Sequence, residues 1–109
     1  MKQSINFNDF IDAFKAHDRY DAYGYEALRV IYDYLEQYEE DTGEEIELDV
    51  IAICCDYDAQ HYTDVAANYR IDVEGLDDDE AKQAVIDYIQ YNSCYLGEAT
   101  DGELVYQVF

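Results

Sequence analysis

Carboxylates are the dominant chemical groups of this chain. Asp and Glu account for 27 of its 109 residues, against 6 Lys and Arg, and the formal net charge is −21. This balance argues against direct binding of nucleic acid, because each phosphate contact needs a cationic side chain to displace counterions. The acids are concentrated in a block between positions 33 and 49 and in a short run at positions 77–80. Together these are Asp33, Glu36, Glu39, Glu40, Asp41, Glu44, Glu45, Glu47, Asp49, Asp77, Asp78, Asp79 and Glu80.

The spacing of the first acids predicts an ordered row on a helix. Apolar residues recur every three or four positions over Tyr23–Asp41, which is typical of an amphipathic helix. Asp33, Glu36 and Glu40 lie opposite this apolar stripe and therefore share one solvent-facing side. Tyr34 projects from the polar side, and we expect it to contact a partner arginine through its ring and hydroxyl.

The second half of the acidic block has the alternation of a strand. Glu45, Glu47 and Asp49 alternate with apolar residues and lead into an apolar run at Ile51–Cys54. In a strand these three acids would lie on one face at intervals of about 6.6 Å, similar to the spacing of phosphates along one DNA strand.

The total charge also resembles that of duplex DNA. A compact domain of this length has a radius of gyration of about 13 Å, and hence a diameter of about 34 Å. Duplex DNA of that length carries about 20 negative charges, close to the net charge of −21. A matching total does not establish a matching pattern, and acidic surfaces are also common for solubility.

Local signals predict about four helices. They are expected over Phe7–His17 with Asn6 as N-cap, over Tyr23–Asp41 with Gly43 as the stop, from Thr63 as N-cap through Tyr69, and after a capping box of Asp77 and Glu80.

The same signals predict three strands. One covers residues 45–54, and a hairpin joins Cys94–Glu98 to Leu104–Phe109 through a turn at Thr100–Glu103. The predicted fold class is α+β: a small three-stranded antiparallel sheet with the helices packed mainly on one face. With no proline and no linker, residues 1–109 are expected to form a single compact acidic domain.

Metal and catalytic chemistry find little support. An EF-hand loop beginning at Asp72 would place Asp77 where the central Gly is required and Gln83 where the closing Glu is required. Carboxylate pairs occur anywhere in so acidic a chain, and catalysis would need one member in an apolar pocket. We therefore expect no enzymatic activity, no cofactor and no bound metal. A metal-dependent acidic domain would instead be strongly stabilised by calcium.

The remaining reactive side chains have structural interpretations. His17 and His61 suit surface or capping positions, because no Ser or Cys partner is indicated by spacing. Cys54 and Cys55 lie in an apolar run, which favours reduced thiols packed in the core.

No targeting or membrane-spanning signal is predicted. The opening residues MKQSINFNDF lack the apolar stretch of a signal peptide, and no run of the sequence is long enough to cross a bilayer. A cytoplasmic location is the expectation.

The segment Tyr25–Tyr57, YEALRVIYDYLEQYEEDTGEEIELDVIAICCDY, resembles a family of small acidic proteins encoded by bacteriophages, prophages and other mobile elements. Its most specific part is EEDTGEEIELDVIAICCDY. The resemblance implies a mobile-element origin. Small acidic phage proteins look like the anti-CRISPR and antirestriction inhibitors that occupy DNA-binding surfaces of host defence complexes as DNA mimics.

Two functions from different classes remain open at this point. One is inhibition by mimicry, in which the acids occupy the basic surface of a CRISPR effector, a restriction enzyme or another DNA-binding protein of the bacterial host. The other is a regulatory interaction module that binds one host protein through a Tyr-rich surface, with the acids serving mainly for solubility. The sequence also leaves open a homodimer, which would double the charged length.

Overall fold

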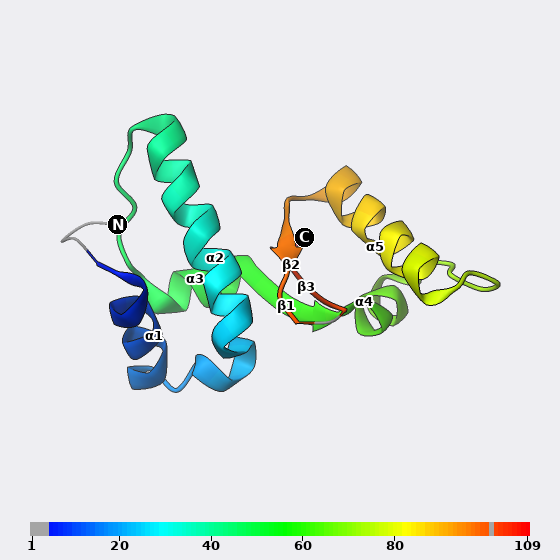
Figure 1. Cartoon of the computed structure of the whole chain (residues 1–109), viewed down its shortest axis with the longest axis horizontal. Coiled ribbons are helices and arrows are strands. Elements are labelled where there is room, and N and C mark those ends of the chain that lie inside the picture. Colours follow the sequence, from blue (N-terminus) through cyan, green and yellow to red (C-terminus); the bar gives the residue numbers. More distant parts are fainter. Residues whose placement is uncertain (1–4, 101) are drawn as a thin grey trace.

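The computed structural model describes residues 5–100 and 102–109, and this part of the chain contains five helices and three strands. Two parts of earlier predictions lie outside the described residues. They are Met1–Ser4 of the opening stretch MKQSINFNDF and Asp101 of the predicted hairpin turn. In chain order the elements are α1 Phe7–Ala16, α2 Tyr20–Thr42, α3 Val50–Asp56, β1 Tyr57–His61, α4 Tyr62–Tyr69, α5 Asp78–Asn92, β2 Tyr95–Glu98 and β3 Glu103–Gln107 (Figure 1). The predicted α+β class is confirmed.

Several helix ends are set by the residues that the local signals indicate. The Asn6 side chain accepts from Asp9 N–H, and the Asp9 carboxylate accepts from Asn6 N–H, so a complete capping box begins α1. Gly43 ends α2 in the left-handed conformation, and the Asp77 carboxylate accepts from Glu80 N–H at the start of α5. The predicted cap at Thr63 is wrong, because the His61 side chain fills this role for α4 by accepting from Thr63 N–H.

The helix α2 begins three residues earlier than expected and contains a kink. Gly24 has φ 79° and ψ 172°, so the backbone leaves the helical conformation at this residue. Residues with a Cβ rarely adopt this positive φ, whereas glycine adopts it without strain. Gly24 therefore allows the kink between the first turn and the long acidic portion of the helix.

The sheet has three antiparallel strands in the order β1-β3-β2, which confirms the predicted number and direction of the strands. One of the three strands is formed by a different segment from the one predicted. The hairpin of β2 and β3 is confirmed, with a bulge between Tyr95 and Gly97. The third strand is β1, in which Ala59 pairs with Val105 and His61 with Glu103. This strand lacks the apolar alternation that would reveal it in the sequence.

The strand predicted at residues 45–54 is wrong. Residues 43–49 form an extended loop without a strand partner, and Val50–Asp56 is the helix α3. Asp49 decides the outcome, because its carboxylate accepts from Ala52 N–H at 3.1 Å and caps the helix. Val50 and Ile53 are then one turn apart and both are buried.

The helices cover both faces of the sheet, which corrects the prediction that they pack mainly on one. Figure 1 shows α1, α2 and α3 on one side of the strands and α4 and α5 on the other. The alternation along β3 accounts for this arrangement: Val105 joins the core under α1–α3, whereas Leu104 and Tyr106 join the core under α4 and α5. A central strand buried on both faces therefore links two hydrophobic cores.

The three layers produce an elongated molecule. Its principal extents are 49 × 30 × 20 Å and its radius of gyration is 14.7 Å, so the predicted diameter of about 34 Å underestimates its length. Among the described residues, no helix combines the length and apolar character needed to cross a bilayer.

Candidate functional site

The structure divides the predicted acidic residues into two groups. The α2 acidic group comprises Asp33, Glu36, Glu39, Glu40 and Asp41 of the helix and Glu44, Glu45, Glu47 and Asp49 of the following loop. The α5 acidic group comprises Asp77, Asp78, Asp79 and Glu80.

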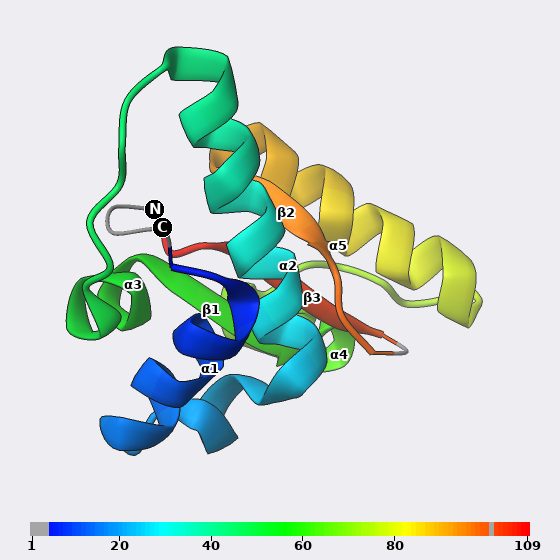
Figure 2. The ribbon, with the colours of Figure 1, turned by 60° about the vertical axis from the view of Figure 1, so that its left-hand side comes forward.

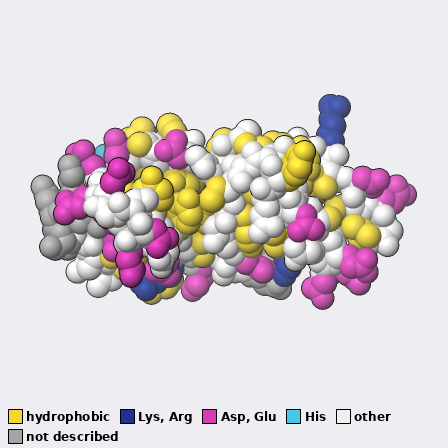
Figure 3. Space-filling model, turned by 90° about the horizontal axis from the view of Figure 1, so that it is seen from above, with side chains coloured by type: hydrophobic (Ala, Val, Ile, Leu, Met, Phe, Trp, Pro, Cys, Tyr) yellow, Lys and Arg dark blue, Asp and Glu magenta, His cyan; other side chains and the backbone are white. Residues whose placement is uncertain are grey.

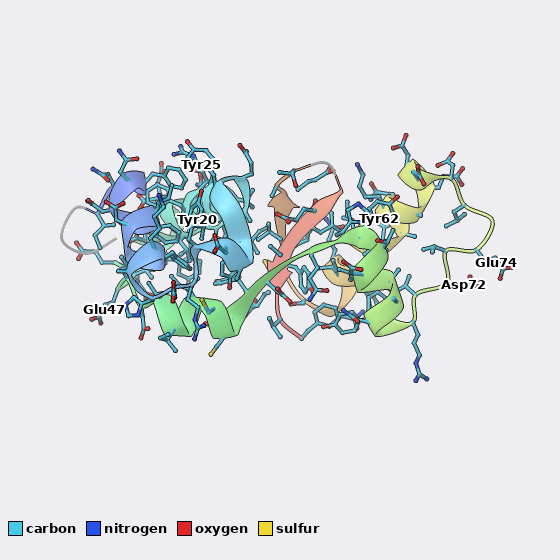
Figure 4. All side chains as sticks on the ribbon, turned by 90° about the horizontal axis from the view of Figure 1, so that it is seen from below. Tyr20, Tyr25, Glu47, Tyr62, Asp72 and Glu74 are labelled. Carbon is cyan, nitrogen blue, oxygen red and sulfur yellow. The ribbon has the colours of Figure 1, made fainter. Side chains whose placement is uncertain are left out.

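The two groups lie on opposite sides of the sheet and so do not form one continuous patch. Figure 4 places Glu47 towards one end of the molecule and Asp72 and Glu74, in the loop before α5, towards the other. Figure 3 shows Asp and Glu side chains gathered mainly towards the two ends of the long axis, with hydrophobic and uncharged atoms between them.

Within the α2 acidic group, the carboxylates surround an open hollow of about 620 Å³. Its lining residues are Asp33, Glu36, Gln37, Glu39, Glu40, Gly43, Glu44 and Glu45. The row predicted from helical spacing therefore faces one space, and the loop adds further acids to it. Figure 2 shows this loop running back from the end of α2 towards α3.

Glu39 holds the acidic loop against the helix. Its carboxylate accepts from Ile46 N–H at 2.8 Å. Desolvation acts to raise the pKa of Glu39, and the hydrogen bond from Ile46 N–H acts in the opposite direction by favouring the charged form. This carboxylate is thus a structural tie for the loop as well as part of its negative surface.

The predicted spacing of Glu45, Glu47 and Asp49 along a strand is not realised, because these residues belong to the loop and to the cap of α3. All three side chains are nevertheless exposed. Ile46 and Leu48, which alternate with them, are partly buried and pack against the core. The alternation thus separates buried from exposed side chains without forming a strand.

Tyr34 is less exposed than predicted. Its ring lies edge-on to that of Tyr57 at a centroid distance of 6.1 Å, and the Cys94 thiol donates to its hydroxyl at 3.4 Å. The hydrogen bond that the hydroxyl shares with the Cys94 sulfur, together with burial, favours the neutral phenol and raises the pKa of Tyr34 to about 12. The phenol is therefore neutral and held in place, and it lines a second hollow on the other side of α2.

This second space, here called the aromatic hollow, has a volume of about 360 Å³. Its lining residues are Tyr34, Leu35, Tyr38, Ile46, Glu47, Asp49, Ala52, Ile53, Asp56, Tyr57 and Gln107. The sequence indicated only Tyr34, Glu47 and Asp49 as functional. Tyr38 was missed because it belongs to the apolar stripe of the helix and was expected to pack in the core. Asp56 and Tyr57 were missed because a strand, and not the helix α3, was predicted just before them.

The histidines and cysteines outside the acidic groups have structural positions or are single exposed side chains. His17 is the C-cap of α1 and His61 the N-cap of α4, in agreement with their predicted structural roles. All three cysteines are free thiols, and Cys54 packs against the core, but Cys55 is exposed and its predicted burial is wrong. In the described part of the chain, no three His, Cys, Asp or Glu side chains are grouped as metal ligands.

No protein-family model, curated protein or solved structure matches this chain. The likeness of Tyr25–Tyr57 to mobile-element proteins thus stays a prediction, and function is inferred from geometry and charge.

Proposed function

We propose that this protein is a nucleic-acid mimic that binds the basic surface with which a host protein holds DNA or RNA. The observation that carries the proposal is the exposure of its charge. No acidic side chain is buried in residues 5–100 and 102–109, and even if all 6 Lys and Arg were paired, 21 of the 27 acids would stay uncompensated. Crowding of like charge opposes folding, so an excess of this size favours a use in binding.

The length of the molecule is compatible with the same interpretation, although the match in total charge is less close than for a body about 34 Å across. A duplex 49 Å long carries about 29 charges at one per about 1.7 Å of axis, and the net charge of −21 is about three quarters of that number. The two acidic groups lie towards opposite ends of this axis. A partner that contacts both must present cations over a comparable length, as a nucleic-acid channel does.

The proposed mechanism is competition for such a channel. Long-range attraction would accelerate encounter with the basic surface, and affinity would fall steeply as salt screens it. The proposed targets are a CRISPR effector complex, a restriction enzyme or a related DNA-binding protein in the cytoplasm of a bacterial host. The protein would act by occupation and not by catalysis.

An interaction module without mimicry is the second candidate, and exposed aromatic rings favour it. Tyr91 is 90% exposed and Tyr25 is 53% exposed, and Val108 and Phe109 are also exposed at the end of the chain. Tyr is enriched at protein interfaces, where it supplies apolar area and a hydroxyl. Binding through any one of these apolar sites would change little with salt.

Salt and competitor DNA separate the two functions. Tagged protein is incubated with bacterial host lysate, and the bound proteins are eluted with a salt gradient, with and without duplex DNA. Mimicry predicts a nucleic-acid-binding protein that both salt and DNA displace. A partner that is indifferent to both would contradict mimicry and favour the interaction module.

A charge-matched pair of variants tests which acids matter. The test variant carries Glu40→Gln, Glu44→Gln and Glu45→Gln in the first hollow. The control carries Asp12→Asn, Glu26→Gln and Asp87→Asn, which are exposed and line neither hollow.

Each variant has three fewer negative charges, so the two have equal net charge. At about 0.2–1 kcal/mol for each exposed charge pair, the test variant should bind the captured partner about threefold to 150-fold more weakly. Equal weakening in the control would show that only total charge matters and would contradict a patterned mimic.

A further inference from the structure

The aromatic hollow joins segments that are distant in the sequence. Its walls come from the C-terminal half of α2, the loop 43–49, the helix α3, the start of β1 and the end of β3. In α2, residues 33, 36, 37, 39 and 40 line the first hollow, of about 620 Å³, whereas residues 34, 35 and 38 line the aromatic hollow. The same helix and loop therefore separate two spaces of different chemistry.

Three tyrosines provide the aromatic surface of this hollow. Tyr34 and Tyr57 are partly buried and held edge to face, with an interplanar angle of 65°. Tyr38 is 44% exposed and lines the same space. An aromatic face is electron-rich and attracts a cation, most strongly where part of the hydration shell is removed.

Three carboxylates line the same space. Asp49 is fixed, because its Oδ1 caps α3, but the side chains of Glu47 and Asp56 have neither a hydrogen bond nor an ion pair within the described chain. No Lys or Arg is among the described residues that line the hollow. No cationic side chain among the described lining residues therefore compensates the negative charge of the hollow.

We propose that the aromatic hollow receives the guanidinium group of an arginine from the partner. This inference rests on the proposed function, in which the partner presents a basic surface. A guanidinium is planar, stacks on tyrosine rings and can donate to two carboxylate oxygens at once, whereas the ammonium of lysine is a strongly hydrated point charge. Glu47 and Asp56 supply the acceptors and Tyr38 the exposed ring.

The size and position of the hollow favour a single side chain on a basic surface. A volume of about 360 Å³ is at the lower end of the range of about 300–1,000 Å³ that is typical of small-molecule sites. Glu47 and Asp49 belong to the α2 acidic group and also line the hollow. The negative potential that attracts a basic surface therefore extends to the hollow itself. The acids would supply attraction, and the hollow would fix the position of the partner.

A direct test uses the whole chain and a blocked arginine, N-acetyl-arginine-N′-methylamide, followed by two-dimensional amide NMR. We expect saturable shifts at Tyr38, Ala52 and Tyr57, with a dissociation constant in the millimolar range that suits a single weak contact. Blocked lysine should bind several-fold more weakly, and sodium chloride at equal ionic strength should not reproduce the shifts. Shifts that do not saturate, or that lysine and salt reproduce, would overturn the inference.

Two matched pairs of variants locate the site. Tyr38→Ala and Asp56→Asn should each weaken binding of blocked arginine about two- to fivefold. Tyr91→Ala and Asp12→Asn remove an exposed tyrosine ring and an equal charge elsewhere, and should leave the affinity unchanged. All four residues are exposed, so the fold should tolerate each change, which circular dichroism checks. Equal effects of Asp56→Asn and Asp12→Asn would indicate diffuse attraction and refute a defined site.

The outcome separates this inference from the proposed function. A partner that DNA displaces, combined with no binding of blocked arginine, would overturn the arginine site and leave mimicry intact. Saturable binding of blocked arginine that Tyr38→Ala weakens, combined with a partner indifferent to salt and DNA, would support the site while mimicry fails.

Discussion

Replacing Gly102 by alanine should destabilise the protein through two separate effects. Gly102 has φ +82°, a conformation that costs an alanine about 1–2 kcal/mol. A Cβ at this position would also lie 2.5 Å from His61 Nε2 and 3.2 Å from Tyr62 Cδ1. The imidazole must therefore move.

Movement of His61 has its own cost. Its ring accepts from Thr63 N–H at 3.3 Å and caps α4. Loss of such a cap costs about 0.5–2 kcal/mol, so the whole substitution should cost about 1.5–4 kcal/mol. For a slope of about 2 kcal/mol per molar urea, the unfolding midpoint should fall by about 1–2 M.

Gly75→Ala is the matched control. Gly75 has φ +81°, but an added Cβ would have no neighbour within 4 Å. Both substitutions restrict the unfolded chain equally, so the difference between them isolates the displacement of His61. Gly102→Ala should be the more damaging by about 0.5–2 kcal/mol.

The double variant supplies the decisive comparison. In a His61→Ala background there is no imidazole to displace and only the 3.2 Å approach to Tyr62 Cδ1 remains, so most of the excess cost of Gly102→Ala over Gly75→Ala should disappear. Urea unfolding followed by circular dichroism measures all of these proteins. Equal costs of the two glycine substitutions in the wild-type background would refute the contact between Gly102 and His61.

Three further predictions concern buried and tethered side chains. Tyr23→Phe should lower the free energy of unfolding by about 1–2 kcal/mol in urea titrations, because the Tyr23 hydroxyl donates to the Tyr57 carbonyl at 2.8 Å and that carbonyl loses its donor. Burial raises the pKa of Tyr23 and Tyr106, so their contribution to stability is complete below their ordinary pKa of 10.0 and is lost as pH rises further. Ultraviolet absorbance should show these phenols ionising only as the chain unfolds, and free ionisation in the folded state would contradict their burial. The Gly102 N–H and the Lys82 ammonium lower the pKa of Glu98, so this carboxylate stabilises the fold above pH 4.5 and the contribution is lost as pH falls through the lowered pKa. Glu98→Gln should accordingly flatten the acid limb of a plot of urea midpoint against pH, and an unchanged limb would count against this tie.

Local signals were sufficient for the elements that need no distant partner. Asn6, Gly43 and Asp77 act on backbone groups within a turn of their own positions, so the sequence determined the start of α1, the end of α2 and the start of α5. Long apolar periodicity fixed α2 for the same reason, because a helix satisfies its hydrogen bonds within one segment.

Strands depend on a neighbour, and here local patterns were misleading. Residues 45–49 alternate as a strand does, yet no other segment pairs with them in the described structure. Val50 and Ile53 suit either a strand or a helix, and the Asp49 cap together with burial against α2 favoured the helix. The polar segment Tyr57–His61 became a strand because β3 offered it a partner.

The charge of this protein was determined by its sequence, and the distribution of that charge by its tertiary structure. Composition gave 27 acids against 6 cations and predicted a basic partner. The burial of β3 on both faces placed α2 and α5 on opposite sides of the sheet, and so divided the acids between the two ends of a 49 Å body. The aromatic hollow likewise exists only after folding, because Tyr38 and Asp56 are brought together by packing between elements that share no local pattern.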